Sequence, residues 1–143
     1  MNNPKTSDKY ENVARKKYCL ITALLGWLGA VNSLLIGLWV LITCLELSQI
    51  PPMKQLLFQA YGAFIVMAIS AFALIYGSYV IWKTSRRKGG IINLFGGLTP
   101  IPVYVYFTLL SQPALKPTLF WPLEYVLLAP AIISGTIATL KLK

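Results

Sequence analysis

Residues 18–45 read YCLITALLGWLGAVNSLLIGLWVLITCL, a run of 28 residues without a charged side chain. A helix crosses the hydrocarbon core of a bilayer with about 20 predominantly apolar residues. The run is therefore long enough to span a membrane as one helix. It also exceeds the apolar core of a cleavable signal peptide, which has about 7–15 residues before a small-residue cleavage site, so we expect it to remain in the membrane.

Three later stretches have the same character. Uncharged runs of 28 and 27 residues cover residues 55–82 and 89–115. A last run, residues 125–140, has 16 residues and reaches spanning length when it is extended back past Glu124. The sequence thus predicts an all-α polytopic membrane protein, an antiparallel bundle of four transmembrane helices near residues 18–45, 57–82, 89–111 and 118–140.

The overall composition agrees with this class. Hydrophobic residues make up 57% of the chain and charged residues only 12%, and the mean hydropathy is +0.66. These values are more apolar than those of a soluble domain. Four spans and their connections occupy nearly all of the 143 residues, so we expect a single transmembrane domain over residues 18–140.

The distribution of basic residues predicts the orientation, because Lys and Arg in short loops are retained in the cytoplasm. Eleven of the thirteen Lys and Arg residues fall in residues 1–17, 83–88 and 141–143. Four spans place these three segments on the same side. We therefore expect a multi-pass protein of the cell membrane, with the basic N-terminal tail and the C-terminus both cytoplasmic.

The net charge of +9 bears on possible partners. Nucleic acid is not expected, because binding it requires a basic face on a soluble fold with side chains arranged to read bases. The lipid bilayer is the expected partner, and anionic headgroups at the cytoplasmic face attract nearby cations by about 1 kcal/mol each. Other membrane subunits and self-association are both compatible with the pattern.

Small residues spaced by four recur along the predicted helices, and such pairs let helices approach closely in lipid. They predict packing within the chain, with contact to another subunit as the alternative. The pairs are Gly26 with Ala30, Ser33 with Gly37, Ala73 with Gly77, and Ala131 with Gly135.

The third predicted helix contains a concentration of helix-breaking residues: Gly96, Gly97, Pro100 and Pro102. Each proline removes a backbone donor and displaces the carbonyl four residues earlier, so a kink is expected at Pro100 and Pro102. Freed carbonyls must find partners in protein or water, because lipid offers none. Two interpretations follow: a ligand-lined break of the kind found in transporters, or a packed kink whose carbonyls are satisfied by neighbouring helices.

Catalytic chemistry is not expected. The chain has no histidine and only four acidic residues, which removes the commonest general base and most zinc, copper and haem sites. The two cysteines, Cys19 and Cys44, lie near opposite ends of one predicted helix and cannot pair. We predict no enzyme activity, no catalytic residues, no cofactor and no metal.

A few polar residues within the apolar runs are candidates for a functional site. Glu124 is the foremost, because an acid at membrane depth is costly, and Tyr104 and Tyr106 are possible hydrogen-bond donors to it. Asn32 lies in the middle of the first predicted helix. For Glu124 we consider a structural hydrogen bond, ion or proton handling, and a contact with a partner.

Two functions fit these features. The first is a non-enzymatic integral membrane protein that serves as an accessory or assembly subunit of a larger membrane complex. The second is a small oligomeric transporter or channel that uses the broken third helix and Glu124.

Overall fold

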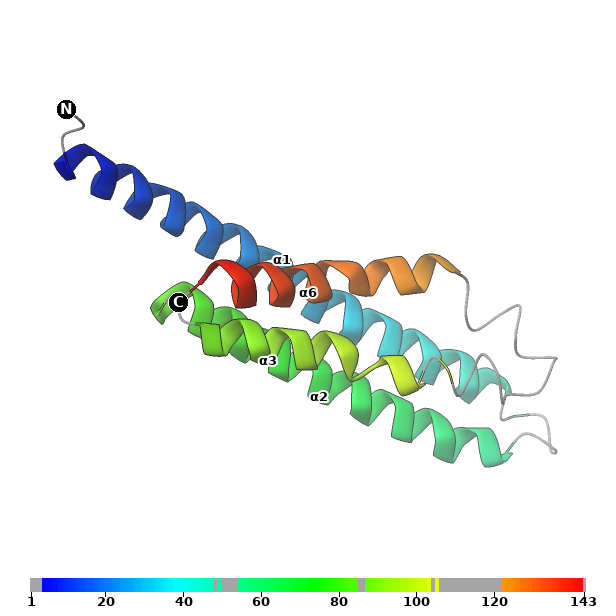
Figure 1. Cartoon of the computed structure of the whole chain (residues 1–143). Coiled ribbons are helices and arrows are strands. Elements are labelled where there is room, and N and C mark those ends of the chain that lie inside the picture. The colour runs from blue at the N-terminus through cyan, green and yellow to red at the C-terminus, as the bar shows by residue number, and fades with distance from the viewer. Residues whose placement is uncertain are drawn as a thin grey trace.

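The computed structural model describes residues 4–47, 49, 54–84, 87–103, 105 and 122–142, and the side chains of 12–46, 49, 58–84, 87–103, 105, 126 and 128–142. All regular structure among these residues is helical, which confirms the predicted all-α, four-helix chain (Figure 1). The helices are α1 (Pro4–Leu47), α2 (Lys54–Thr84), α3 (Arg87–Leu98) and α6 (Pro122–Lys141).

The four helices form an antiparallel ring. Each helix packs against its neighbours in the chain, and α6 closes the ring by packing against α1. The start of α1, the end of α2, the start of α3 and the end of α6 all lie at one end of the bundle (Figure 1). Helices that are far apart in the sequence, such as α1 and α6, therefore lie side by side.

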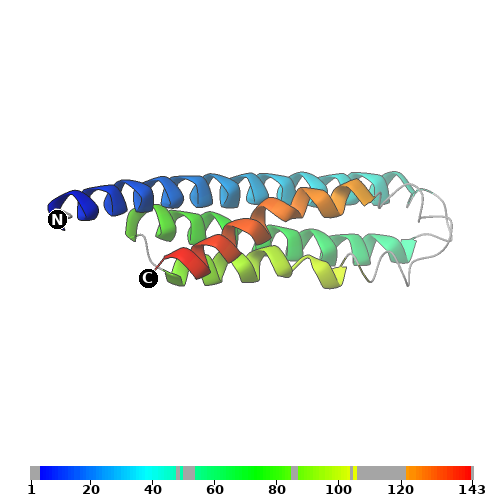
Figure 2. The same cartoon turned by 45° about the horizontal axis from the view of Figure 1, so that its top comes forward.

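Helix α1 is much longer than the apolar run that it contains. It begins at Pro4 and has 44 residues, a length of about 66 Å at 1.5 Å per residue. Its first turns project beyond the ends of the other helices (Figure 2). Proline is favoured in the first turn of a helix, and no further proline or glycine occurs before Gly26, so nothing in the sequence interrupts the helix ahead of residue 18.

Helix α3 ends early. It stops at Leu98, and a turn at residues 99–100 leads into a short helical stretch at 101–103. The interruption lies at the glycines and prolines where a kink is expected from the sequence. The remainder of the predicted helix, at residue 104 and from 106 to 111, lies outside the described residues.

The packing places small side chains inside and large apolar ones outside. Alanine, cysteine and serine predominate among the buried residues, whereas Leu, Ile, Phe, Tyr and Trp side chains cover the exterior. Two helical stretches, Asn12–Glu46 and Phe58–Thr84, are long and apolar enough to cross a membrane, and Leu128–Lys141 is a shorter apolar stretch. Only 39% of the most apolar part of each long stretch is buried, so most of its side chains face outward.

Candidate functional site

A buried polar layer joins all four helices. On α3, the Asn93 side chain is fully buried, and its Nδ2 donates hydrogen bonds to Ser78 Oγ on α2 at 3.1 Å and to Ser134 Oγ on α6 at 2.9 Å. Ser134 Oγ in turn donates to the backbone carbonyl of Thr22 on α1, at 2.6 Å. One asparagine therefore connects a continuous hydrogen-bond network across the bundle.

The hydrogen bonds fix the orientation of the Asn93 amide. The single hydrogen of Ser134 Oγ is donated to Thr22, so this oxygen can only accept from Asn93. The nitrogen of the amide must then face Ser134, and Oδ1 points the other way, toward Gly77. Oδ1 has no hydrogen-bond partner among the described residues.

Two glycines allow the helix backbones to approach the polar layer closely. A Cβ placed on Gly26 would overlap Ser78 Oγ and Asn93 Nδ2, and one placed on Gly77 would overlap Asn93 Oδ1. The polar atoms are thus already in contact with backbone on both sides. At these two positions the layer therefore has no room for even one additional methyl group.

Two clusters of buried apolar residues flank the polar layer along the bundle axis. The cluster toward the end of the bundle where α6 terminates consists of Cys19, Ile81, Ala138 and Leu142. The cluster on the opposite side consists of Ala30, Ala71, Leu74 and Ala131.

A second polar contact lies where α3 ends. Ser70 Oγ on α2 donates a 2.6 Å hydrogen bond to the carbonyl of Gly96, which Pro100 deprives of its helical partner. Ser33 Oγ on α1 lies 3.3 Å from Ser70 Oγ. Thr99 donates its backbone and side-chain hydrogens to the carbonyl of Phe95. The expectation that freed carbonyls find partners in protein is met at Gly96, and this contact favours the packed kink.

Removing the Ser70 hydroxyl should destabilise the bundle. Ser70→Ala leaves the buried carbonyl of Gly96 without a donor, which typically costs about 1–3 kcal/mol. Ser33→Ala is the matched control, because it removes only the longer contact to Ser70. Detergent-micelle denaturation of both variants measures the two effects, and a control variant as unstable as Ser70→Ala would contradict the role given to the Gly96 carbonyl.

The residues that the sequence predicts for a site differ in how deeply they are buried. Asn32 is only partly buried, whereas its neighbour Ser33 is fully buried and contacts Ser70. Gly96 and Gly97 are buried in α3, Gly97 against Ala131 and Ile132 of α6, Pro100 is buried in the turn, and Pro102 is exposed. The side chains of Glu124, Tyr104 and Tyr106 lie outside the described residues, so their roles stay predictions.

Asn93 is the buried polar residue that was not singled out from the sequence. A signal was present, since the sequence GGIINLFGG places Asn93 between two glycine pairs, at Gly89 and Gly90 and at Gly96 and Gly97. Spacings of three and four residues put these positions on one side of a helix. A polar residue within such a small-residue face is directed into the bundle.

Other features of the described residues do not add a reactive site. No group of three His, Cys, Asp or Glu side chains is close enough to hold a metal within the described ranges. Cys19 and Cys44 are both buried and unpaired with each other, as expected. An apolar hollow of about 340 Å³ lies between α2 and the segment after the break, lined by Phe58, Gln59, Gly62, Ala63, Val66, Pro102 and Val103.

No family model, curated protein or solved structure matches this chain. Its function is therefore inferred from the chemistry and packing of its own residues.

Proposed function

We propose that the chain is an integral membrane protein whose four helices cross the bilayer. Support comes from the distribution of side-chain size, in which small residues lie inside the bundle and large apolar residues lie on its exterior. In lipid, helices associate through small residues and interhelical hydrogen bonds, while large apolar side chains face the acyl chains. The glycines and serines of the interior and the exposed Phe72 and Phe95, at 72% and 67% exposure, follow this rule.

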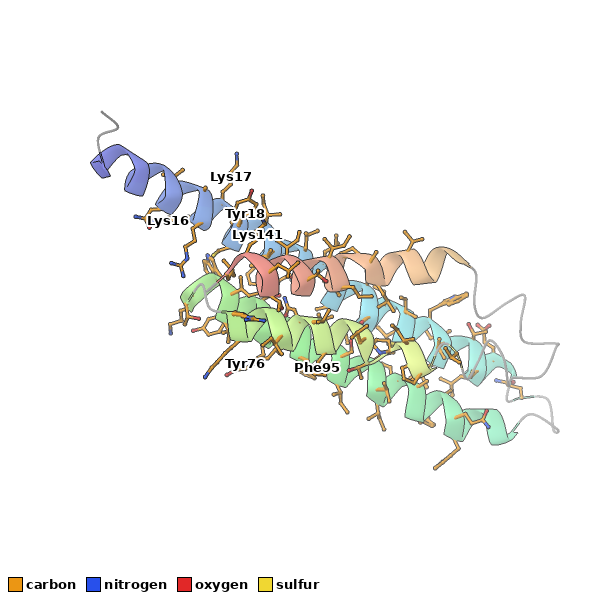
Figure 3. All side chains as sticks on the ribbon, in the orientation of Figure 1. Lys16, Lys17, Tyr18, Tyr76, Phe95 and Lys141 are labelled. Atoms are coloured by element: carbon orange, nitrogen blue, oxygen red, sulfur yellow. The ribbon has the colours of Figure 1, made fainter. Side chains whose placement is uncertain are left out.

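The proposed orientation places the end of the bundle that contains both termini in the cytoplasm. Lys16 and Lys17 on α1 and Lys141 on α6 lie at this end (Figure 3). Trp27 and Trp82 pack edge to face near it, with ring centroids 6.1 Å apart. Cations and Trp or Tyr side chains at one end are typical of a cytoplasmic membrane boundary.

Cysteine labelling tests this orientation. The two native cysteines are buried, so they should give little background. Thr84→Cys at the cytoplasmic end and Gln49→Cys at the other end are both at exposed positions. We expect an impermeant thiol reagent added outside intact cells to label the Gln49 variant and to label the Thr84 variant only after lysis; the reverse pattern would show that the orientation is inverted.

Within the membrane, we propose that the protein acts as a non-enzymatic accessory or assembly subunit of a larger membrane complex. The observation that carries this proposal is the buried polar layer. The hydroxyls of Ser78 and Ser134 and the Asn93 Nδ2 bond to one another and to backbone, and glycine backbone lies directly against them. Groups arranged in this way serve to hold helices together.

A small oligomeric transporter is the alternative. It would use the break in the third helix and Glu124. The hydrogen bond from Ser70 to the Gly96 carbonyl argues against a ligand-lined break, because this freed carbonyl already has a donor within the protein. The proposed role of Glu124 is independent of this contact.

Native mass measurement after mild detergent extraction from the source membranes tests the two functions. An accessory subunit should be recovered in a particle that contains larger, unrelated membrane subunits in fixed stoichiometry. A transporter should be recovered as a self-contained oligomer of this chain. Recovery as a monomer after gentle extraction, with no partner at any detergent concentration, would contradict both proposals.

A further inference from the structure

We infer that the outer face of the α1/α2 pair binds one anionic phospholipid of the cytoplasmic leaflet. This inference rests on the proposed membrane orientation and goes beyond a general attraction to lipid, because it assigns the headgroup and an acyl chain to particular residues. Three features on this face, taken in order from the membrane boundary inward, carry it.

The first feature is a cationic group at the boundary. Lys83 lies at the end of α2, and its Nζ donates a 3.0 Å hydrogen bond to the hydroxyl of Tyr79. The same Nζ lies 5.4 Å from the centre of the Tyr79 ring. The ammonium group is thereby held against the helix surface with donors left over, since a lysine ammonium has three. A phosphate oxygen can accept from one of them.

The second feature is an aromatic wall directly below this group. Trp82 is 58% exposed and packs against Trp27 of α1. Ile75, Tyr79 and Trp82 follow each other at spacings of four and three residues, so they lie on one face of α2. The wall therefore connects the position of Lys83 to the groove between the two helices.

The third feature is an apolar slot at the inner end of this wall. It has a volume of about 280 Å³ and is lined by Trp27, Ala30, Val31, Leu34 and Ile75. Ile75 precedes Lys83 by eight residues, which corresponds to about 12 Å along the helix. Half of the hydrocarbon core measures about 15 Å. A lipid with its phosphate at Lys83 thus places the inner part of one acyl chain in the slot.

The positive charge of the surrounding side chains determines which class of lipid headgroup binds. The described cations at this end of the bundle include Lys16, Lys17, Lys83, Arg87, Lys88 and Lys141, and a zwitterionic headgroup would gain little from them. An anionic headgroup gains from each nearby cation. Apart from the indole N–H of Trp27, the side chains that line the slot carry no hydrogen-bonding group, so the slot favours hydrocarbon.

Brominated lipids provide a direct test, because bromine on an acyl chain quenches tryptophan fluorescence on contact. The protein, with Trp39→Phe and Trp121→Phe to leave Trp27 and Trp82 as reporters, is reconstituted into phosphatidylcholine vesicles. Brominated phosphatidylglycerol or brominated phosphatidylcholine is then added in increasing proportion. We expect half-maximal quenching at an about five-fold lower fraction of the anionic lipid, the factor expected for one cation near the surface.

Two variants with the same charge change make the test specific. Lys83→Gln should raise the half-maximal fraction of phosphatidylglycerol to the value for phosphatidylcholine. Lys141→Gln, at the same end but on α6, should leave it unchanged. Val31→Phe fills the slot and should reduce quenching by the anionic lipid. Inorganic phosphate should not displace the lipid, because phosphate carries no acyl chain.

The possible contrary results are distinct. Equal quenching by both lipids in the parent protein, or equal effects of the two lysine variants, would overturn the inference while leaving the membrane proposal intact. Quenching that is relieved by a sterol and not by unbrominated phosphatidylglycerol would also overturn it, in favour of a sterol in the slot. If neither brominated lipid quenches either tryptophan, the proposed membrane insertion itself is wrong.

Discussion

Replacing Gly77 by alanine should force α2 away from α3 and lower the free energy of unfolding by about 1–3 kcal/mol, the usual cost of overpacking. A Cβ at this position would overlap Asn93 Oδ1 and lie 2.9 Å from the backbone carbonyl oxygen of Gly89. The approach is reciprocal, because a Cβ on Gly89 would lie 2.6 Å from the carbonyl oxygen of Gly77. The Gly89 carbonyl is backbone, and the Asn93 side chain is held by its hydrogen bonds to Ser78 and Ser134, so relief requires movement of a whole helix.

Gly62 on the same helix provides the matched control for this prediction. A Cβ there would meet nothing within 4 Å. Alanine is favoured over glycine inside a helix by roughly 0.5–1 kcal/mol, so Gly62→Ala should be neutral or stabilising. Denaturation of both variants in mixed detergent micelles measures the two changes, and a loss of the same size at both positions would contradict close approach at Gly77.

A second large effect is expected at the centre of the polar layer. Asn93→Asp keeps the shape of the side chain but replaces the donating nitrogen by an oxygen. That oxygen would face Ser134 Oγ, whose hydrogen is already donated to the Thr22 carbonyl. Two hydrogen-bond acceptors, the new carboxylate oxygen and Ser134 Oγ, then face each other. The carboxylate is also buried without a cation to balance its charge. Leaving an uncompensated buried charge costs roughly 3–5 kcal/mol, so this variant should fold poorly or fail to accumulate.

Asn93→Leu separates the charge from the lost hydrogen bonds. Leucine removes both donated bonds without adding a charge, and a buried hydrogen bond between membrane helices contributes about 0.6–1.7 kcal/mol. We therefore expect a smaller loss than for aspartate. A leucine variant as stable as the parent protein would show that the layer is dispensable, and one as unstable as the aspartate variant would show that charge is not the main cause.

The helices could be predicted from the sequence because their cause is local. An uncharged run of spanning length is a property of consecutive residues, and the glycines and prolines from Gly96 to Pro102 act on the helix that contains them. The end of α3 at Leu98 follows from that chemistry. The small-residue pairs likewise identified the buried faces, since Ala30, Ser33 and Ala131 are all buried.

The buried polar residue could not be selected in the same way. Asn32 and Asn93 are both uncharged residues within apolar runs, and although glycine pairs flank Asn93, its burial depends on how its helix is rotated in the bundle. That rotation depends on contacts with the other helices, such as the bonds from Asn93 to Ser78 and Ser134. The extension of α1 to Pro4 was missed for a different reason. Counting apolar residues detects helices that can cross a membrane, but it does not detect a helix made of polar residues.

The projecting start of α1 has an electrostatic consequence. Between Pro4 and Lys17 the helix covers 13 steps of 1.5 Å, about 20 Å along its axis. The Debye length at physiological ionic strength is about 8 Å. With the bundle in the proposed orientation, Lys16 and Lys17 are within the field of the headgroups, whereas the tip is more than two screening lengths away. The tip and the boundary cations are thus electrically independent, and a partner that binds the tip would do so without competing with lipid for charge.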